Sequence, residues 1–130
     1  MTDEQTAPDD PTTAPFWAAA RNHQLVIQRC ANCGQYQFYP RPFCLACGDR
    51  GVEWVPAKGT GTIYSITTVH IPVIPELTPP YRVAIVQLDE GPRLTTNVVD
   101  VACAIGDRVR VTWRERSGIP PLPVFERQPV

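Results

Sequence analysis

Four of the five cysteines in the 130-residue chain lie in two identical C-x-x-C-G frames. The first frame, CANCG, spans residues 30–34, and the second, CLACG, spans residues 44–48. Each frame places two sulfur atoms on one side of a tight turn, and its glycine lets loop amides point at the thiolates. Two facing frames would form a closed four-sulfur tetrahedron. The spacing therefore predicts a metal site, in preference to disulfides or free thiols, with four ligands: Cys30, Cys33, Cys44 and Cys47.

The metal that suits four thiolates is zinc or, as in rubredoxin-like sites, iron. We expect Zn2+, because structural zinc is the usual occupant of paired frames of this kind. A closed four-sulfur site leaves no open position for water or substrate, so its metal would be structural and not a Lewis-acid catalyst. An iron site would instead indicate an electron carrier.

The segment between the two frames is rich in aromatic residues: Tyr36, Phe38, Tyr39 and Phe43. Aromatic side chains bury large areas, so they would form the core of so small a module. The alternative is a partly exposed surface that binds a partner or an acyl group. Arg41 lies between two prolines, which hold its backbone extended, and it would either reach an anionic ligand or stay solvated.

The rest of the chain offers no self-contained catalytic site. Neither of its two histidines, His23 and His70, adjoins a recognisable nucleophile. Cys103 has apolar neighbours and is expected to be buried. The GTGT stretch at residues 59–62 is too short for a phosphate-binding or dinucleotide-binding loop and is expected to turn the chain from the metal module into the next domain. The sequence therefore predicts a protein that is not itself an enzyme.

Composition and charge narrow the classes of partner. Hydrophobic residues make up 43% of the chain, and the formal net charge is −1. Nucleic-acid-binding proteins usually carry a strong basic excess, so no nucleic-acid partner is expected. No run approaches the roughly 18 apolar residues of a membrane span. The acidic N-terminus has no basic or apolar signal region, which predicts a cytoplasmic protein whose thiols stay reduced.

Three regions of different character follow one another along the chain. Residues 1–12 are rich in Asp, Thr and Pro and predict a disordered tail. Residues 13–56 predict a short helix, capped by Thr13 with Pro15 in its first turn and extending to about residue 24, followed by the zinc ribbon. The apolar face of this helix would pack on its own domain or dock a partner. Residues 57–130 predict an OB-fold domain.

The predicted fold class is mainly β. Strands are expected at residues 24–30 and 51–57, beside the cysteine frames, and then as runs of β-branched residues between turn signals. These runs are Thr60–Ile71, Arg82–Leu88, Leu94–Val99 and Arg108–Arg114. Four or five short strands over about 70 residues favour a five-stranded OB-type barrel. Prolines near the C-terminus predict extended, irregular chain there.

Apolar and basic residues alternate in the last of these runs, DRVRVTWRER. Strand alternation places Val109, Val111 and Trp113 on the inner face of the barrel. Three arginines would then face outward: Arg108, Arg110 and Arg114. They would either contact phosphates or an acidic partner, or form a solvated outer face.

The order of the motifs resembles a known family. Residues 15 to about 127 contain in sequence QLVIQRCANCG, FYPRPFCLACG, GTGTIYS, TTVH, PPY and LDEG. This combination resembles the bacterial and archaeal family that joins an N-terminal rubredoxin-like zinc ribbon to a C-terminal OB-fold (domain of unknown function thirty-five). Members of that family accompany thiolases and thiolase-like enzymes of acyl-CoA metabolism, or are fused to hydratases.

The resemblance implies a non-catalytic subunit that binds and stabilises a thiolase or a thiolase-like steroid side-chain aldolase in a hetero-oligomer. It also implies a CoA thioester as ligand, an acyl-CoA hydratase as a further partner, and a place in sterol or other lipid catabolism. The four cysteines carry over as metal ligands. The resemblance supplies no motif for the surface that faces the acyl-CoA or the partner. We nominate for it the following aromatic and basic residues: Tyr36, Phe38, Tyr39, Arg41, Phe43, Lys58, His70, Arg82, Arg108 and Arg110.

Two other functions stay open at this point. OB-folds often bind single-stranded nucleic acid through aromatic residues and basic grooves, although the net charge of −1 argues against this function. A rubredoxin-like electron carrier would need iron, which would make the purified protein red, whereas a zinc protein is colourless.

Overall fold

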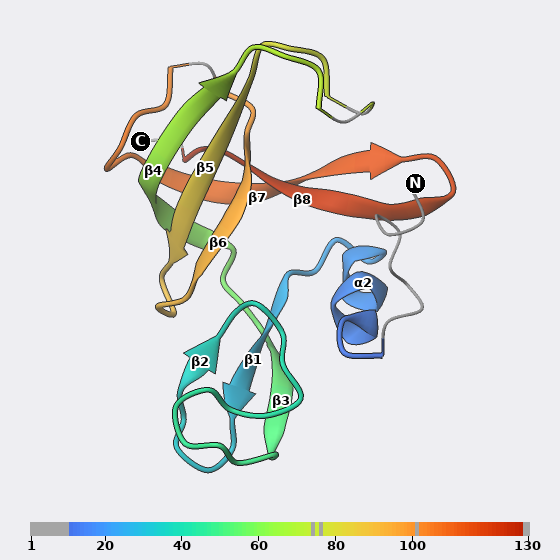
Figure 1. The fold of residues 1–130 in the computed structure, drawn as a ribbon, viewed down its shortest axis with the longest axis vertical. Coiled ribbons are helices and arrows are strands. Elements are labelled where there is room, and N and C mark those ends of the chain that lie inside the picture. Colours follow the sequence, from blue (N-terminus) through green and yellow to red (C-terminus); the bar gives the residue numbers. More distant parts are fainter. Residues whose placement is uncertain (1–10, 74, 76, 101, 129–130) are drawn as a thin grey trace.

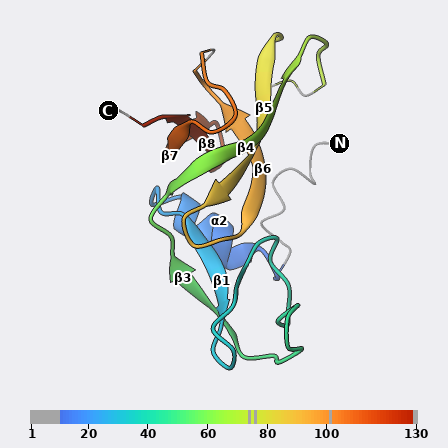
Figure 2. The same cartoon turned by 90° about the vertical axis from the view of Figure 1, so that its left-hand side faces the viewer.

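The computed structural model describes residues 11–73, 75, 77–100 and 102–128. Figures 1 and 2 show a small sheet at one end of the molecule, a helix beside it and a β-barrel at the other end. The expected disordered tail lies outside the described residues except for its last two, which belong to a turn at residues 11–13. No helix in the described ranges is long and apolar enough to cross a membrane.

The metal module is a three-stranded antiparallel sheet in the order β2-β1-β3. Its strands are β1 (Val26–Cys30), β2 (Tyr36–Gln37) and β3 (Val52–Pro56). β1 pairs along its whole length with β3, from Val26↔Pro56 to Cys30↔Val52. The first cysteine frame therefore connects β1 to β2, and the second lies in the loop between β2 and β3.

The N-terminal helix, α2, spans Ala14–Ala20. Thr13 is its N-cap residue and a proline lies in its first turn, as predicted, but the Thr13 side chain makes no capping hydrogen bond. The helix ends four residues before the predicted end at about residue 24. Residues 21–23 form a turn in which His23 has φ of 57°, a left-handed conformation that no α-helix continues.

The apolar face of α2 packs on its own chain. Phe16 and Ala20 are buried, and the helix contacts β1 and β8. His23, just beyond the helix, stacks its ring on Trp113 of β7 with the ring centroids 5.7 Å apart, and its Nε2 lies 2.5 Å from Glu115 Oε2. The N-terminal segment is therefore attached to both the small sheet and the barrel.

Five strands form a closed barrel in the order β4-β5-β6-β8-β7. This confirms the predicted mainly-β fold with a five-stranded barrel. Figure 1 shows β7 and β8 crossing the other three strands at a steep angle. The strands are β4 (Thr60–Val69), β5 (Tyr81–Leu88), β6 (Arg93–Val98), β7 (Arg108–Arg116) and β8 (Ile119–Arg127).

The last strand, β8, falls where the sequence predicts irregular chain, so that prediction was wrong. Its sequence, IPPLPVFER, has three prolines, yet it pairs with β7 from Val109↔Arg127 to Arg116↔Ile119. Two of the prolines, at 120 and 121, lie where the register shifts, and bulges tolerate proline. The third, Pro123, lies at a position whose N–H would point away from β7, so the β7–β8 ladder loses no hydrogen bond.

One hydrophobic cluster connects the parts of the molecule. It runs from Phe16 of the helix and Ile27 of the small sheet to Val86, Val109 and Phe125 inside the barrel. The inward direction predicted for Val109 is confirmed, since it is fully buried. This shared core fixes the position of the small sheet against the barrel.

Gly59 allows the sharp passage from β3 into β4. It has φ of 81°, and a Cβ atom at this position would lie 2.7 Å from Cγ1 of Val111. Any other residue at this position would be strained, both by the backbone conformation and by the close contact. The GTGT stretch therefore turns the chain into the barrel, as predicted.

Candidate metal centre and adjoining groove

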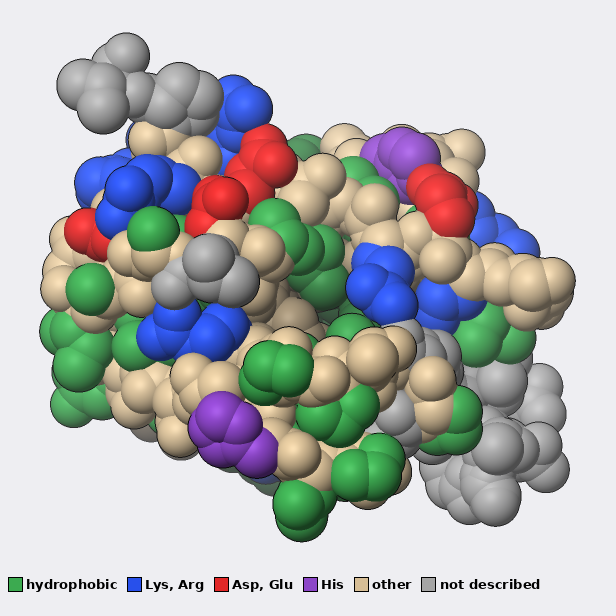
Figure 3. Space-filling view, turned by 90° about the horizontal axis from the view of Figure 1, so that it is seen from above, with side chains coloured by type: hydrophobic (Ala, Val, Ile, Leu, Met, Phe, Trp, Pro, Cys, Tyr) green, Lys and Arg blue, Asp and Glu red, His purple; other side chains and the backbone are tan. Residues whose placement is uncertain are grey.

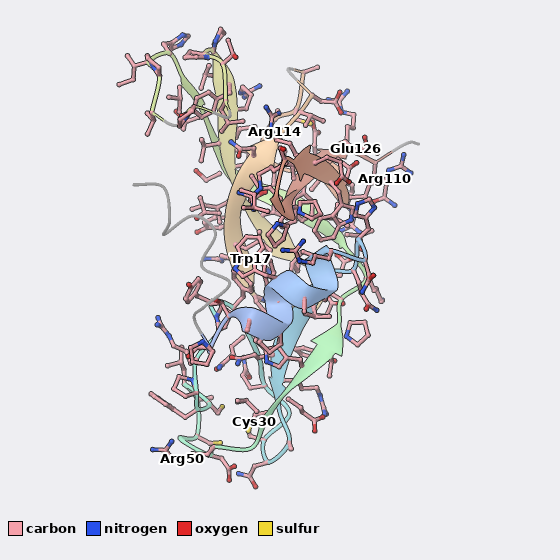
Figure 4. All side chains as sticks on the ribbon, turned by 90° about the vertical axis from the view of Figure 1, so that its right-hand side faces the viewer. Trp17, Cys30, Arg50, Arg110, Arg114 and Glu126 are labelled. Atoms are coloured by element: carbon pink, nitrogen blue, oxygen red, sulfur yellow. The ribbon has the colours of Figure 1, made fainter. Side chains whose placement is uncertain are left out.

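The two cysteine frames bring four sulfur atoms together at the end of the small sheet that is farthest from the barrel (Figure 4, where Cys30 is labelled). All four Sγ atoms lie within 4.8 Å of one another. Cys30 Sγ lies 3.7 Å from Cys47 Sγ, and Cys33 Sγ lies 3.7 Å from Cys44 Sγ. A tetrahedron with metal–sulfur bonds of about 2.3 Å has edges of about 3.8 Å. The cluster therefore fits one tetrahedral metal ion and not a pair of disulfides.

The backbone of both frames is arranged to support thiolates. The two glycines have φ of 79° and 81°. The N–H of Gly34 donates to Cys30 O at 2.9 Å, and the second frame repeats this bond at 2.8 Å. The N–H of Cys33 donates to Cys30 Sγ at 3.4 Å, and that of Ala46 donates to Cys44 Sγ at 3.3 Å. The two N–H···S bonds disperse negative charge on the sulfur atoms.

The thiols of the cluster titrate unequally. The N–H of Gln35 lowers the pKa of Cys33, but burial and the neighbouring cysteines outweigh it and raise this pKa to about 11. The N–H groups of Cys47 and Ala46 lower the pKa of Cys44. Sulfur atoms this close cannot all ionise unless a cation balances their charge. The donor set therefore calls for a metal ion.

Two buried glutamines, Gln28 and Gln37, hold the loop that carries the aromatic residues. Gln28 Nε2 donates to Arg41 O at 2.8 Å, and Arg41 N–H donates to Gln28 Oε1 at 2.8 Å. Gln37 Nε2 donates to Gln28 Oε1 at 2.8 Å, and Leu45 N–H donates to Gln37 Oε1 at 3.0 Å. The side-chain amides thus act as a strand partner for the loop. The sequence analysis missed both residues.

Replacing Gln28 by leucine is expected to loosen this loop. The leucine fills the space but leaves the N–H and C=O of Arg41 without their partners, which costs about 1–3 kcal/mol of unfolding free energy. Amide hydrogen exchange at Arg41 and Leu45 should become faster, and the thermal midpoint should fall. Gln35→Leu, at an exposed position of the same module, is the control and should change neither. Unchanged exchange at Arg41 in Gln28→Leu would contradict the role given to the glutamines.

The aromatic residues of this loop divide into an inner and an outer pair. Tyr36 and Phe38 pack against the shared core. Tyr39 and Phe43 are 53% and 39% exposed, and the guanidinium of Arg41 lies 5.7 Å from the centroid of the Tyr39 ring. Tyr36 and Phe38 therefore belong to the core, whereas Tyr39 and Phe43 are exposed. The outer pair gives the small sheet an exposed aromatic surface.

A groove of about 430 Å³ lies where the helix, this loop and the barrel meet. Figure 4 shows Trp17 of α2 between the helix and the barrel. Most of the side chains around the groove are apolar, with three threonines, Asn97 and Arg93 as the polar groups. Its lining residues are Thr13, Phe16, Trp17, Phe38, Tyr39, Pro40, Arg93, Leu94, Thr95, Thr96, Asn97, Leu122 and Pro123.

The other residues implied to face a ligand do not gather around this groove. His70 follows β4 at the end of the barrel away from the small sheet (Figure 1). Lys58 is exposed between β3 and β4, where its N–H donates to Glu90 Oε2 at 2.8 Å. Arg82 lines a second pocket, of about 410 Å³, together with Arg114. The implied surface is therefore spread over several faces of the molecule.

The arginines of β7 face outward, as predicted, and two of them have carboxylate partners. Arg108 donates to both carboxylate oxygens of Asp89 at 2.7 and 2.9 Å. Arg110 Nε donates to Glu126 Oε2 at 2.7 Å, a pair labelled in Figure 4. Figure 3 shows basic side chains beside acidic ones on the face seen there. These ion pairs reduce the positive charge available for a phosphate.

The ion pair of Asp89 predicts a change of stability at low pH. Hydrogen bonds from Arg108 and Thr60 lower the pKa of Asp89 to about 2 from 3.8. Because the pKa is lower in the folded state, the pair stabilises the fold above about pH 4, and this contribution is lost as the pH falls toward 2. Asp89→Asn should therefore lose less stability than the wild type between pH 4 and pH 2. Urea unfolding across this range is the measurement, and parallel curves would contradict the prediction.

No catalytic arrangement is found in the described ranges. His23 and His70 lie on different parts of the fold, and neither hydrogen-bonds a serine, threonine or cysteine there. Cys103 is 3% exposed, as predicted, and burial raises the pKa of its thiol. A buried thiol with a raised pKa is a poor nucleophile.

The chain is related to two proteins that are much longer than itself and to one of similar length. The chain is 44% identical over 85% of its length to a "Probable enoyl-CoA hydratase alpha subunit" of Thermomonospora curvata. It is 36% identical over 78% of its length to the "3-oxo-4,17-pregnadiene-20-carboxyl-CoA hydratase alpha subunit" of Mycobacterium tuberculosis. These matches span only 36% and 33% of the two relatives. A "DUF35 domain-containing scaffold protein" of Methanothermobacter thermautotrophicus is 33% identical, over 73% of this chain and 75% of that protein.

Two solved structures have the same fold. A chain of the "Ltp2-ChsH2(DUF35) aldolase" superposes with a TM-score of 0.83 and 40% identity, covering 91% of this chain and 95% of that chain. A DUF35 protein of unknown function from Sulfolobus solfataricus superposes with a TM-score of 0.67 over 96% of this chain and 95% of that chain. At 13% identity, the second shares the fold alone.

Two family models match consecutive parts of the chain. The rubredoxin-like zinc ribbon domain of ChsH2 matches residues 17–53, which include the four cysteines. The C-terminal OB-fold domain of ChsH2 matches residues 54–114, which include most of the barrel. The chain therefore belongs to the ChsH2 family of proteins, in which a rubredoxin-like zinc ribbon precedes an OB-fold domain.

Proposed function

We propose that this chain is a non-catalytic subunit that binds and stabilises a thiolase-like enzyme acting on CoA thioesters. The observation that carries the proposal is the likeness, at 40% identity over 91% of the chain, to a chain of the Ltp2-ChsH2(DUF35) aldolase. The relatives named as scaffold proteins and as alpha subunits of CoA-thioester hydratases support it. A hydratase subunit is accordingly a further partner.

The chemistry of the described residues agrees with a subunit that supplies no reacting group. All four cysteines of the cage would bind the ion and leave no open coordination position, and Zn2+ suits this ligand set best. The metal therefore holds the loops and takes no part in a reaction. No nucleophile and base are paired within the described ranges. What the ribbon offers outward is the aromatic surface of Tyr39 and Phe43 beside Arg41, on a loop fixed by two glutamines. We assign this surface to the enzyme partner.

The substrate class and the setting are part of the same proposal. One relative is named for a steroid-derived CoA thioester, which supports sterol or related lipid catabolism. We also place the chain in the cytoplasm, where thiols stay reduced and can bind a metal ion. We divide the chain at residues 56 and 57, between β3 and β4, into the metal module with its helix and the OB-fold domain.

Co-expression tests the proposal. The chain is produced with the thiolase-like enzyme encoded by the same source, and the mixture is separated by size-exclusion chromatography. We expect one hetero-oligomeric peak, and we expect the chain by itself to release no product from a CoA thioester. Separate elution of two proteins at micromolar concentration, with the enzyme fully active alone, would overturn the proposal.

A further inference from the structure

Tyr64 lies at an irregularity of the barrel that turns its side chain outward. The register of β4 against β5 shifts between Ile63 and Ser65, so Tyr64 is the extra residue of a β-bulge. Ile63 is buried, whereas the two residues that follow it are both exposed. Bulges redirect side chains in this way. Tyr64 is therefore 51% exposed, on the outer face of β4, β5 and β6, which lie side by side (Figure 1).

The side chain of Arg93 is fixed on the ring of Tyr64. Its Cζ atom lies 3.7 Å from the centroid of the ring, a close cation–π contact. Its Nε donates to Oε1 of Gln87, the residue opposite it on β5, at 3.1 Å. Contacts from two neighbouring strands thus hold a long, exposed side chain in one orientation. A guanidinium that is already ordered loses less conformational entropy when it binds a ligand.

Arg93 differs from three other arginines of the barrel in what holds it. Arg108, Arg110 and Arg127 each lie 2.7–2.8 Å from a carboxylate oxygen of the same chain. Among the described residues Arg93 has no ion pair, and its contacts are an aromatic ring and a neutral amide. Its orientation is therefore fixed, but its charge is not neutralised.

We propose that Arg93, held on Tyr64, is a docking point for an Asp or Glu side chain of the enzyme partner. The choice of partner rests on the function proposed above, and the docking point adds a contact on the barrel to the aromatic surface of the ribbon. The guanidinium fork matches a carboxylate with two parallel hydrogen bonds. Arginine and tyrosine are also among the residues that contribute most to the affinity of protein interfaces.

A phosphate group fits this place less well than a carboxylate. Phosphate recognition commonly uses a cluster of arginines. The pocket beside Tyr64, of about 310 Å³, has Asp89 among its lining residues, and the part of the chain that the structure describes contributes no second cation to that lining. One ordered guanidinium suits a single negative charge.

The affinity for the enzyme tests the docking point. The full chain is titrated by calorimetry into the thiolase-like enzyme encoded by the same source. Arg93→Gln should weaken the complex about tenfold or more, and the affinity of the wild type should fall more steeply with salt than that of the variant. Arg21→Gln is the matched control. It removes the same charge from an exposed arginine after α2, and its affinity should stay within about twofold of the wild type.

Carbodiimide coupling tests the contact itself. Lys58 is the only lysine in the sequence. In a Lys58→Arg background, Arg93→Lys therefore places the only side-chain amine at the docking point. The carbodiimide should join this amine to an Asp or Glu side chain of the enzyme, and mass spectrometry of the digested complex should find the cross-linked peptide. Arg21→Lys in the same background should give no such peptide.

The outcomes separate this proposal from the one on which it rests. If the wild type binds the enzyme, then equal affinity of Arg93→Gln, or no cross-link from position 93, overturns the docking point and leaves the enzyme complex standing. Competition by inorganic phosphate, beyond that of chloride at equal ionic strength and lost in Arg93→Gln, would identify a phosphate site and overturn the choice of a carboxylate. A wild-type chain that forms no complex overturns both proposals.

Discussion

Removal of the metal ion is expected to unfold the small sheet and to leave the barrel folded. Structural zinc contributes about 10–16 kcal/mol of apparent binding free energy in zinc-finger peptides, more than the module could supply from its own packing. Strand β2 has only two residues, and the long loop after it depends on two glutamines and on the cage. The barrel closes through its own strands and needs none of the four ligands.

The most specific way to remove the metal ion is the substitution Cys44→Ser. Cys44 is 1% exposed and is anchored by backbone bonds within its frame, so its loss should reduce bound zinc from one ion per chain to a small fraction. Elemental analysis measures the metal, and amide NMR spectra should lose dispersed signals for residues 26–56 only. Cys103→Ala removes a buried thiol outside the cage and should keep the ion. Stoichiometric zinc and intact ribbon signals in Cys44→Ser would contradict the closed four-sulfur cage.

Truncation of Phe125 is expected to have the second largest effect. Phe125 is fully buried, lies on β8 and accepts the hydrogen bond from Val99 that closes the barrel. Replacing a buried phenylalanine by alanine costs about 3–5 kcal/mol, which approaches the whole stability of many small domains, about 5–15 kcal/mol. The midpoint of urea unfolding should therefore fall sharply.

Val99→Ala provides the matched control for Phe125→Ala. Val99 lies at the same junction but is 54% exposed, and its N–H bond to Phe125 survives the substitution. Its urea midpoint should stay close to that of the wild type. Equal effects of the two substitutions would mean that burial at position 125 does not hold β8 in the barrel.

The metal cage could be predicted from the sequence because its four ligands lie in two short, recognisable motifs. Two C-x-x-C-G frames define two turns, and a metal ion is the only ordinary reason for four reduced thiols to meet. Gln28 and Gln37 gave no such signal. A glutamine in a strand is usually solvated, and only the folded module shows that both side chains turn inward and bond to the loop at residues 41–45.

The missed strand and the shortened helix have different physical reasons. Prolines argue against a strand unless their missing N–H groups fall on an unpaired edge or in a bulge, and this depends on the register with β7, which the sequence does not reveal. The helix ends early because His23 leaves helical φ to stack on Trp113, a contact between residues far apart in the sequence.

The persistence of the enzyme's activity tests the central claim most directly. The thiolase-like enzyme is incubated at a fixed temperature with and without an equimolar amount of this chain, and cleavage of its CoA thioester is assayed over time. The account predicts that the chain extends the half-life of activity about tenfold or more by mass action on the folded enzyme, while the chain alone forms no product. An enzyme equally active and equally long-lived without the chain, or turnover by the chain alone, would contradict it.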